Sequence, residues 1–335
     1  MRMRRRVLVT GVGSGIGQGI LVALKKHKLK YKIYVSDASI YSAGLYLSRN
    51  SLLTGKLENS LELEKFLKMV IDYKIEIIFP GNEFDLISLS HQKARIKQQT
   101  GALVISSKFE TIEIANDKWK TYNFCLNNDI PAPKTFLITN TQDIKEAAMT
   151  LNFPFVIKPR FGTASRGIAY VNNLQEAETA INSVKQPLAQ EFLKPESSDL
   201  TSEYTCSVFK DKNGLLHGPF IAERNLKGGS TWIAKVADKH SLHEFLLKIA
   251  NALDFSGPLN IQLIETLDGP KLLELNCRFS GTTGIRSYFG FNEPEMAIKS
   301  FLQGKLLKKT KLQEGTVVRY IADVVIRKGN FKKHL

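Results

Sequence analysis

The chain has 335 residues, of which 43% are hydrophobic and 24% are charged. This composition is typical of a folded protein with two or three domains, and it excludes a disordered or fibrous chain. The formal net charge is +15, but most of the excess lies at the two ends, in residues 1–6 and 305–335. We therefore favour solvated chain ends over a patch for an anionic partner, and we expect no nucleic-acid partner.

Neither a membrane anchor nor a cysteine framework is indicated. No apolar run of about 18 residues occurs, so we expect no membrane span and a cytoplasmic protein. The cysteines Cys125, Cys206 and Cys277 are far apart and lack the paired spacing of metal ligands. We therefore expect reduced packing residues, and neither a disulfide nor a zinc site.

Strands and helices alternate in the first third of the chain. Short apolar segments predict strands over residues 7–10, 32–36 and 75–79. A glycine-rich turn into a helix separates the first two, and an amphipathic helix over 61–73 separates the last two. This alternation is typical of a parallel sheet, so we predict an α/β Rossmann-like domain over residues 1–112.

Antiparallel hairpins dominate the remainder of the chain. The predicted strand pairs are 155–158 with 168–171, 203–210 with 215–222, and 259–266 with 271–276. Turn residues such as Asp268-Gly269 separate the strands of a pair. We predict an α+β region that divides into residues 113–188 and 189–335.

The first glycine-rich loop, Thr10–Gly17, follows a predicted strand and enters a helix. It resembles the opening of short-chain dehydrogenases, in which such glycines let the backbone approach a pyrophosphate, and Asp37 could then hold a ribose. That chemistry also needs a tyrosine four residues before a lysine, and none of the ten tyrosines has one. We favour a structural turn over a nicotinamide site, and another anionic ligand stays open.

The second glycine-rich loop lies between two strands. Lys158 ends the first strand, and the loop that follows consists of Gly162, Thr163, Ala164, Ser165, Arg166 and Gly167. A strand-loop-strand order differs from the strand-loop-helix order of a Walker-type loop, so we expect a hairpin that covers phosphates with free N–H groups and hydroxyls. Lys158 would then supply a point charge to the phosphate oxygens.

Neighbouring segments are compatible with a nucleotide. The segment Gln190, Glu191, Phe192 and Leu193 could offer backbone edges to an adenine, and Glu203 lies within reach of a ribose. Lys118 precedes Lys158 by forty residues. Each signal is weak by itself.

The last hairpin concentrates oxygen donors. Glu274 and Asn276 share one face of a strand because alternate residues point the same way, and Gln262 lies on the partner strand. One carboxylate and two amide oxygens suit Mg²⁺. The same alternation predicts that Arg278 looks into this site, although an amide pair that merely stabilises the hairpin stays open.

Together these stretches resemble the ATP-grasp superfamily, most closely one synthetase unit of the carbamoyl-phosphate synthase large chain. The resemblance covers residues 7–305 and depends on the order of seven stretches, Asn116–Lys118, Phe155–Arg160, Gly162–Gly167, Gln190–Leu193, Ser202–Tyr204, Gly257–Gln262 and Glu274–Thr283. It implies a Rossmann-like (pre-ATP-grasp) domain followed by an α+β ATP-grasp fold.

The resemblance also implies roles for individual residues. Lys118 and Lys158 would contact the ATP phosphates, under the 162–167 loop. The other implied roles are adenine binding by Glu191 and the Leu193 backbone, ribose binding by Glu203, binding of Mg²⁺ or Mn²⁺ by Gln262, Glu274 and Asn276, and stabilisation of the transferred phosphoryl group by the catalytic Arg278. Cys277 stands where many relatives carry proline, and we expect it to pack.

The acceptor substrate is the least determined part. Its candidate segments are residues 80–85, 223–225, 227–231 and Arg286. From them we select Glu83 and Arg224 as substrate-binding residues. The chain has one synthetase-like unit where carbamoyl-phosphate synthase has two, so we do not expect carbamoyl phosphate as the product.

The predicted function is an ATP- and Mg²⁺-dependent carboxylate–amine (or carboxylate–thiol) ligase that forms an acylphosphate. We expect small-molecule carboxylate and amine substrates, and a homodimer stays open. The alternatives are a nicotinamide-dependent oxidoreductase that uses the first glycine-rich loop, and a non-enzymatic nucleotide-binding protein.

Overall fold

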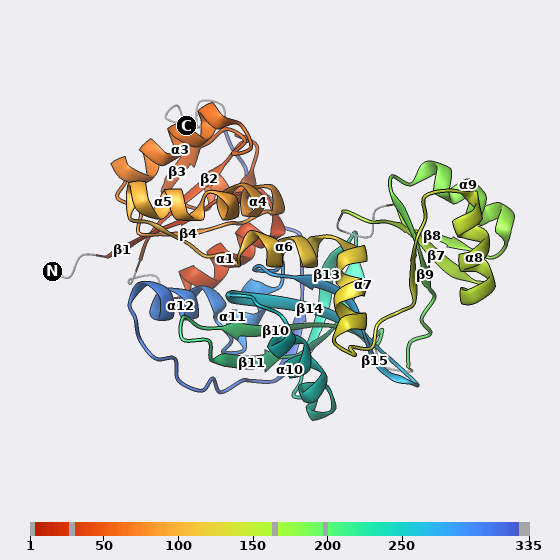
Figure 1. Ribbon diagram of the computed structural model, residues 1–335. Coiled ribbons are helices and arrows are strands. Elements are labelled where there is room, and N and C mark those ends of the chain that lie inside the picture. The colour runs from red at the N-terminus through yellow and green to blue at the C-terminus, as the bar shows by residue number, and fades with distance from the viewer. Residues whose placement is uncertain (1–3, 27–30, 163–166, 197–199, 328–335) are drawn as a thin grey trace.

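A computed structural model describes residues 4–26, 31–162, 167–196 and 200–327 (Figure 1). The N-terminal domain is a five-stranded parallel sheet with the order β3-β2-β1-β4-β5. Its strands are β1 (Arg5–Val9), β2 (Tyr31–Asp37), β3 (Asn50–Leu53), β4 (Ile77–Phe79) and β5 (Leu103–Val104). Its helices are α1 (Gly15–Lys25), α2 (Ala43–Tyr46), α3 (Ser60–Asp72), α4 (Glu83–His91) and α5 (Lys93–Thr100). The predicted Rossmann-like domain is confirmed.

Two helices, α6 (Phe109–Asn116) and α7 (Lys118–Asn127), lead from this domain into a small subdomain. The small subdomain is a four-stranded antiparallel sheet with the order β6-β9-β7-β8 and two helices. Its elements are β6 (Thr135–Leu137), α8 (Thr141–Leu151), β7 (Phe155–Pro159), β8 (Ala169–Val171), α9 (Leu174–Ser183) and β9 (Pro187–Glu191). It projects from the rest of the molecule in Figure 1 and has a hydrophobic core of its own.

The third sheet has seven strands, in the order β15-β14-β10-β12-β13-β16 with β11 paired to β10. Its strands are β10 (Glu203–Lys210), β11 (Leu216–Phe220), β12 (Ala222–Lys227), β13 (Ser230–Val236), β14 (Gly257–Thr266), β15 (Gly269–Asn276) and β16 (Gly315–Val318). The helical elements around it are η1 (His240–Leu242), α10 (His243–Ala252), α11 (Thr283–Tyr288), α12 (Glu293–Ala297) and η2 (Ile298–Leu302). The predicted antiparallel α+β region is therefore confirmed as well.

Turn chemistry explains where the hairpins fold back. The Asp211 carboxylate accepts hydrogen bonds from the backbone N–H groups of Asn213 and Leu215, and Gly214 has a φ of 84° that favours glycine. Gly269, with a φ of 96°, turns β14 into β15. The sequence predicts both turns from these residue types.

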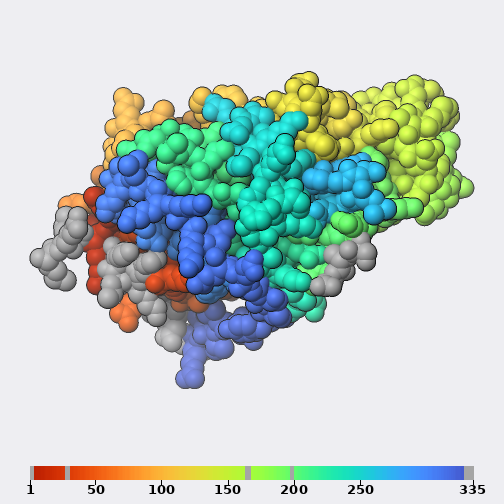
Figure 2. All heavy atoms as spheres, turned by 90° about the horizontal axis from the view of Figure 1, so that it is seen from below, coloured from red at the N-terminus to blue at the C-terminus, as the bar shows by residue number. Residues whose placement is uncertain are grey.

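The N-terminal domain and the seven-stranded sheet share one hydrophobic core. Val7 and Val9 of β1 belong to the same buried cluster as Phe209 and Phe220 of the large sheet. In Figure 2 the C-terminal segment crosses this face of the molecule, and the small subdomain lies at the far end. No helix in the described part of the chain is long and apolar enough to cross a membrane. The division at residues 112 and 188 stays a proposal.

Candidate active site

A cavity of about 270 Å³ lies between the small subdomain and the seven-stranded sheet. Many of the predicted site residues line it: Lys118, Lys158, Gly162, Gln190, Glu191, Phe192, Leu193, Glu203, Arg224, Gln262 and Glu274. We call it the nucleotide cavity. Thr163, Ala164, Ser165 and Arg166 lie outside the described residues. Asn276, Arg278, Gly167 and Glu83 are described but are not among its lining residues.

Two lysines form the cationic end of the nucleotide cavity. The Lys158 ammonium donates to the side-chain oxygen of Gln190 at 2.5 Å, and the Lys118 ammonium donates to the Gly162 carbonyl at 2.8 Å. Burial lowers the pKa of Lys158 to about 8, an effect that the nearby Lys118 charge adds to and Glu274 opposes. Burial also lowers the pKa of Lys118. An anionic group bound here would stabilise the charged forms of both buried ammonium groups.

An ion pair fixes the positions of these lysines. The Arg160 guanidinium donates from Nε and Nη2 to the two oxygens of Asp117, at 2.8 and 2.6 Å. Asp117 is also the N-cap of α7, because it accepts from the backbone N–H groups of Trp119 and Lys120. The backbone N–H of Lys118 donates to the Arg160 carbonyl at 3.2 Å. The start of α7 is thus tied to the end of β7.

The hairpin of β14 and β15 brings the proposed metal ligands together. Gln262 lies directly opposite Glu274, and the Asn276 amide donates to Glu274 at 2.9 Å. This convergence was predicted. The Gln262 side-chain oxygen accepts from Arg224 at 2.8 Å, so a cation that used this oxygen would have to compete with a guanidinium.

The prediction that strand alternation continues to Arg278 is wrong. β15 ends at Asn276, and the backbone N–H of Arg278 donates to the Asn276 carbonyl at 2.8 Å, which is a tight turn. The Arg278 side chain donates to the Phe279 carbonyl at 3.1 Å. A catalytic role for Arg278 stays a prediction without this geometric argument.

The polar residues of the base and ribose end are paired within the cavity walls. Glu203 accepts from Arg224, with a distance of 3.0 Å from Nε. Glu191 accepts from the backbone N–H of Lys134 at 3.0 Å and from the Lys271 ammonium at 3.4 Å. Arg224, selected as an acceptor residue, therefore lies beside the predicted ribose and metal ligands.

The apolar walls of the cavity were not predicted. They include Val156, Ile168 and Tyr170 from the β7–β8 hairpin, and Ile264 and Leu273 from β14 and β15. Apolar walls of this kind are typical of sites that bind a ring such as a purine. Alternation along the strands indicates which residues share a face, but the sequence does not reveal that the two hairpins face each other.

Two acceptor candidates have different surroundings. Glu83 begins α4, and its charge acts on Lys118, which places it near the cationic end of the cavity. Arg286 is fully buried and pairs with Glu293 at 2.9 Å. Arg286 also donates to the Asn260 side chain. It therefore stabilises the packing of α11 and α12 on the sheet.

The first glycine-rich loop is used for packing. The Gly13 N–H donates to Asp37 at 2.7 Å, so this carboxylate holds the loop itself. A Cβ at Gly17 would lie 2.5 Å from the Gly11 carbonyl oxygen, and one at Gly81 would clash with the Thr10 carbonyl oxygen. Glycine is required for these close approaches, which supports the structural interpretation of the loop. The three cysteines are buried and free, as predicted.

Comparison with known proteins agrees with this architecture. The profile of a family described as "ATP-grasp in the biosynthetic pathway with Ter operon" matches residues 200–324. The structure also superposes on many solved structures, and two enzymes illustrate this. One is an N5-carboxyaminoimidazole synthetase from Staphylococcus aureus complexed with ADP, with a TM-score of 0.74, 18% identity, and coverage of 96% of this chain and 83% of that chain. The other is the biotin carboxylase domain of a Hydrogenobacter thermophilus 2-oxoglutarate carboxylase, with a TM-score of 0.73, 16% identity, and coverage of 94% and 74%.

The chain therefore has an ATP-grasp fold, its residues 200–324 match an ATP-grasp family, and it resembles one synthetase unit of the carbamoyl-phosphate synthase large chain. It is 24% identical to that protein of Thermoanaerobacter pseudethanolicus, over 92% of this chain and 30% of the relative. A phosphoribosylamine–glycine ligase of Pyrococcus horikoshii is 22% identical, over 89% of this chain and 74% of that protein. The chain spans less than a third of the carbamoyl-phosphate synthases that it matches.

We expect the affinity for Mg-ATP to fall as the pH rises through about 8, because Lys158, with a pKa of about 8, loses its charge there. In Lys158→Arg the fall should be smaller, because arginine stays protonated. Isothermal titration calorimetry below and above this pH measures the effect, with the exposed Lys145→Arg as control. An affinity that does not change with pH in the wild type would show that Lys158 makes no contact with the phosphates.

We expect Asp117→Ala to lower the free energy of unfolding by about 2 kcal/mol, because it removes a helix cap and a charge-assisted pair whose carboxylate is 4% exposed. Glu113→Ala is the control. Its ion pair with Lys120 is more than 40% exposed on both sides, so the loss should stay below about 0.5 kcal/mol. Urea unfolding measures both. Equal losses of unfolding free energy in the two variants would show that the Asp117–Arg160 pair stabilises the fold no more than the exposed pair does.

Proposed function

We propose that this protein is an ATP-dependent carboxylate–amine ligase that acts through an acylphosphate. The observation that carries the proposal is the nucleotide cavity, in which apolar walls lead to Lys118, Lys158 and the carboxylate of Glu274. The relatives named as ligases and synthases, and the ADP in the Staphylococcus aureus structure, support it. A thiol nucleophile in place of the amine is the variant of this proposal.

The chain's own residues would act mainly by placing charge. The protonated ammonium groups of Lys118 and Lys158 bind triphosphate oxygens. A substrate carboxylate attacks the γ-phosphorus, the bond to the β-γ bridging oxygen breaks, and ADP leaves. The amine then attacks the acyl carbon, loses a proton, and expels phosphate. Positioning and electrostatic stabilisation account for such catalysis without a covalent enzyme intermediate.

Glu274, Asn276 and Gln262 would hold Mg²⁺ or Mn²⁺. Their donors are one carboxylate and two amide oxygens, which fit a hard divalent cation. For both amides to offer oxygen, Asn276 must turn its N–H away from Glu274, and Gln262 must release Arg224. A bound ion would neutralise charge on the phosphate oxygens.

The nicotinamide alternative is not favoured. Asp37, which would bind the ribose of such a cofactor, is held by the backbone N–H groups of Gly13 and Ser39. The helix that follows the glycine loop packs against the C-terminal region, where Gly19 of α1 meets the backbone of Gly284. These contacts stabilise the interface between domains and leave the loop little freedom for a dinucleotide.

We expect Mg-ATP to raise the melting temperature and NAD or NADP to leave it unchanged. A ligand present at 100 times its dissociation constant adds about 2.7 kcal/mol to native-state stability. Thermal melts with each ligand measure this. A shift with the nicotinamide cofactors and none with Mg-ATP would exclude the ligase.

We expect the protein with ATP and its carboxylate substrate, but no amine, to give a hydroxamate when hydroxylamine is added, because hydroxylamine captures an acylphosphate. An ADP-release screen over amino acids and hydroxy acids identifies the carboxylate first. A phosphorylated side chain and no hydroxamate would reject the acylphosphate route.

We expect Glu274→Gln to lower turnover at least a hundredfold, corresponding to about 2.7 kcal/mol of barrier, while the fold persists. The substitution keeps the shape but removes the carboxylate of the proposed metal site. Glu146→Gln on the exposed face of α8 is the control. Unfolding of the variant, or full activity at limiting Mg²⁺, would make Glu274 a structural residue.

A further inference from the structure

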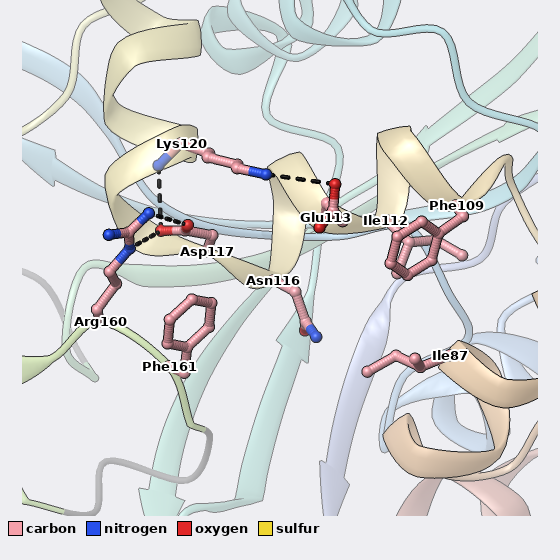
Figure 3. Close-up of a pocket in the computed structure, with 9 residues that line it drawn as sticks. All are labelled: Ile87, Phe109, Ile112, Glu113, Asn116, Asp117, Lys120, Arg160 and Phe161. Carbon is pink, nitrogen blue, oxygen red and sulfur yellow. Dashed lines mark hydrogen bonds and ion pairs between the residues drawn. The ribbon is translucent and has the colours of Figure 1, made fainter. Parts of the chain in front are cut away.

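A second cavity, of about 370 Å³, lies beside the Asp117–Arg160 pair (Figure 3). It is formed by α4, α6, the first turn of α7 and the end of β7. Its lining residues are Ile87, Phe109, Ile112, Glu113, Asn116, Asp117, Lys120, Arg160 and Phe161. Among them, Asp117, Arg160 and the backbone N–H of Lys120 also enter the account of the nucleotide cavity above.

The walls of the second cavity favour a neutral group. The charged side chains that line it are paired with each other, Asp117 with Arg160 at 2.6 Å and Glu113 with Lys120 at 3.3 Å. Aromatic and aliphatic side chains supply much of the remaining surface. A charged ligand would have to break one of these pairs, whereas a ring could pack against the apolar walls at no such cost.

One polar side chain is left for a ligand. The Asn116 carboxamide has no hydrogen-bond partner among the residues that the structure describes, and Figure 3 shows it projecting between Phe161 and Ile87. A carboxamide offers both donors and an acceptor. It would therefore recognise an amide or carbonyl edge on an otherwise apolar group.

The two cavities share a wall. Lys118 and Gly162 line the nucleotide cavity, while their chain neighbours Asp117 and Phe161 line the second one. Helix α4 connects the two sites as well. Ile87 lies one turn after Glu83, whose charge acts on Lys118 at the phosphate end. A molecule in the second cavity would thus lie next to the phosphates of bound ATP.

We propose that the second cavity binds the non-reacting part of the acceptor substrate, a neutral ring-sized group with an amide or carbonyl edge that Asn116 recognises. This rests on the proposed ligase function. A volume of about 370 Å³ is near the lower end of small-molecule sites, which run from about 300 to 1,000 Å³, and is large enough for one ring. The cavity would then select among acceptors, while the nucleotide cavity supplies the phosphoryl group.

Benzamide, a neutral ring with an amide edge, tests the cavity without any assay of turnover. Saturation-transfer NMR and calorimetry should show binding to the wild type. Ile87→Trp fills the cavity and Asn116→Ala removes the amide, and each should weaken benzamide binding at least tenfold. The controls Leu126→Trp and Asn251→Ala lie on exposed helix surfaces and should bind like the wild type. The dissociation constant for Mg-ATP checks that each variant is folded.

Kinetics then test the link to the acceptor. Carboxylates and amines with and without a neutral ring are compared by ADP release. The ring-bearing acceptor should have a KM at least tenfold higher in Ile87→Trp and Asn116→Ala, and benzamide should compete with the acceptor but not with ATP.

The outcomes separate the cavity from the ligase. Absence of benzamide binding in the wild type, or equal binding in the cavity variants, overturns the proposal. An acceptor KM that neither variant changes also overturns it. A third outcome is that both variants weaken benzamide binding but no pair of substrates gives ADP release. This outcome confirms the ligand cavity and rejects the ligase function, and the acceptor assignment is rejected with it.

Discussion

The ion pair between Asp117 and Arg160 is the constraint on which both cavities depend. Asp117 caps α7 and binds the guanidinium that follows β7, so the chain segments that carry Lys118 and Lys158 are held together. The two lysines lie forty residues apart in the sequence. The pair acts together with the hydrogen bonds from the Lys118 backbone N–H to the Arg160 carbonyl and from the Lys118 ammonium to the Gly162 carbonyl, which join the same two segments.

The pair also bears on the electrostatics of the cleft. Burial lowers the pKa values of both lysines, and the Lys118 charge lowers the pKa of Lys158 further. Such an arrangement costs stability in the free protein, because charged groups are removed from water. The attraction between a bound polyanion and the two ammonium groups would offset this desolvation penalty.

Much of this organisation could be predicted from the sequence, and the exceptions have physical reasons. Period-two alternation places Gln262, Glu274 and Asn276 together because they belong to one hairpin with a short turn. The same rule fails at Arg278, where the chain turns immediately after the strand. Arg286, a candidate for the acceptor site that was not selected, is buried against Glu293 of α12 and Asn260 of β14. The sequence pattern of a strand predicts which of its side chains share a face. It does not predict which side chains from another part of the chain pack against that face.

The small subdomain carries its own core, and this matters for how the two cavities work together. Lys158 and Phe161 both lie at its edge, one facing the nucleotide cavity and the other facing the second cavity. Because residues 158–161 are contiguous, a shift of this edge moves both walls at once. In the proposed function this edge would face the nucleotide on one side and the acceptor on the other. A ligase gains from this arrangement, because phosphoryl transfer without an acceptor in place would only hydrolyse ATP.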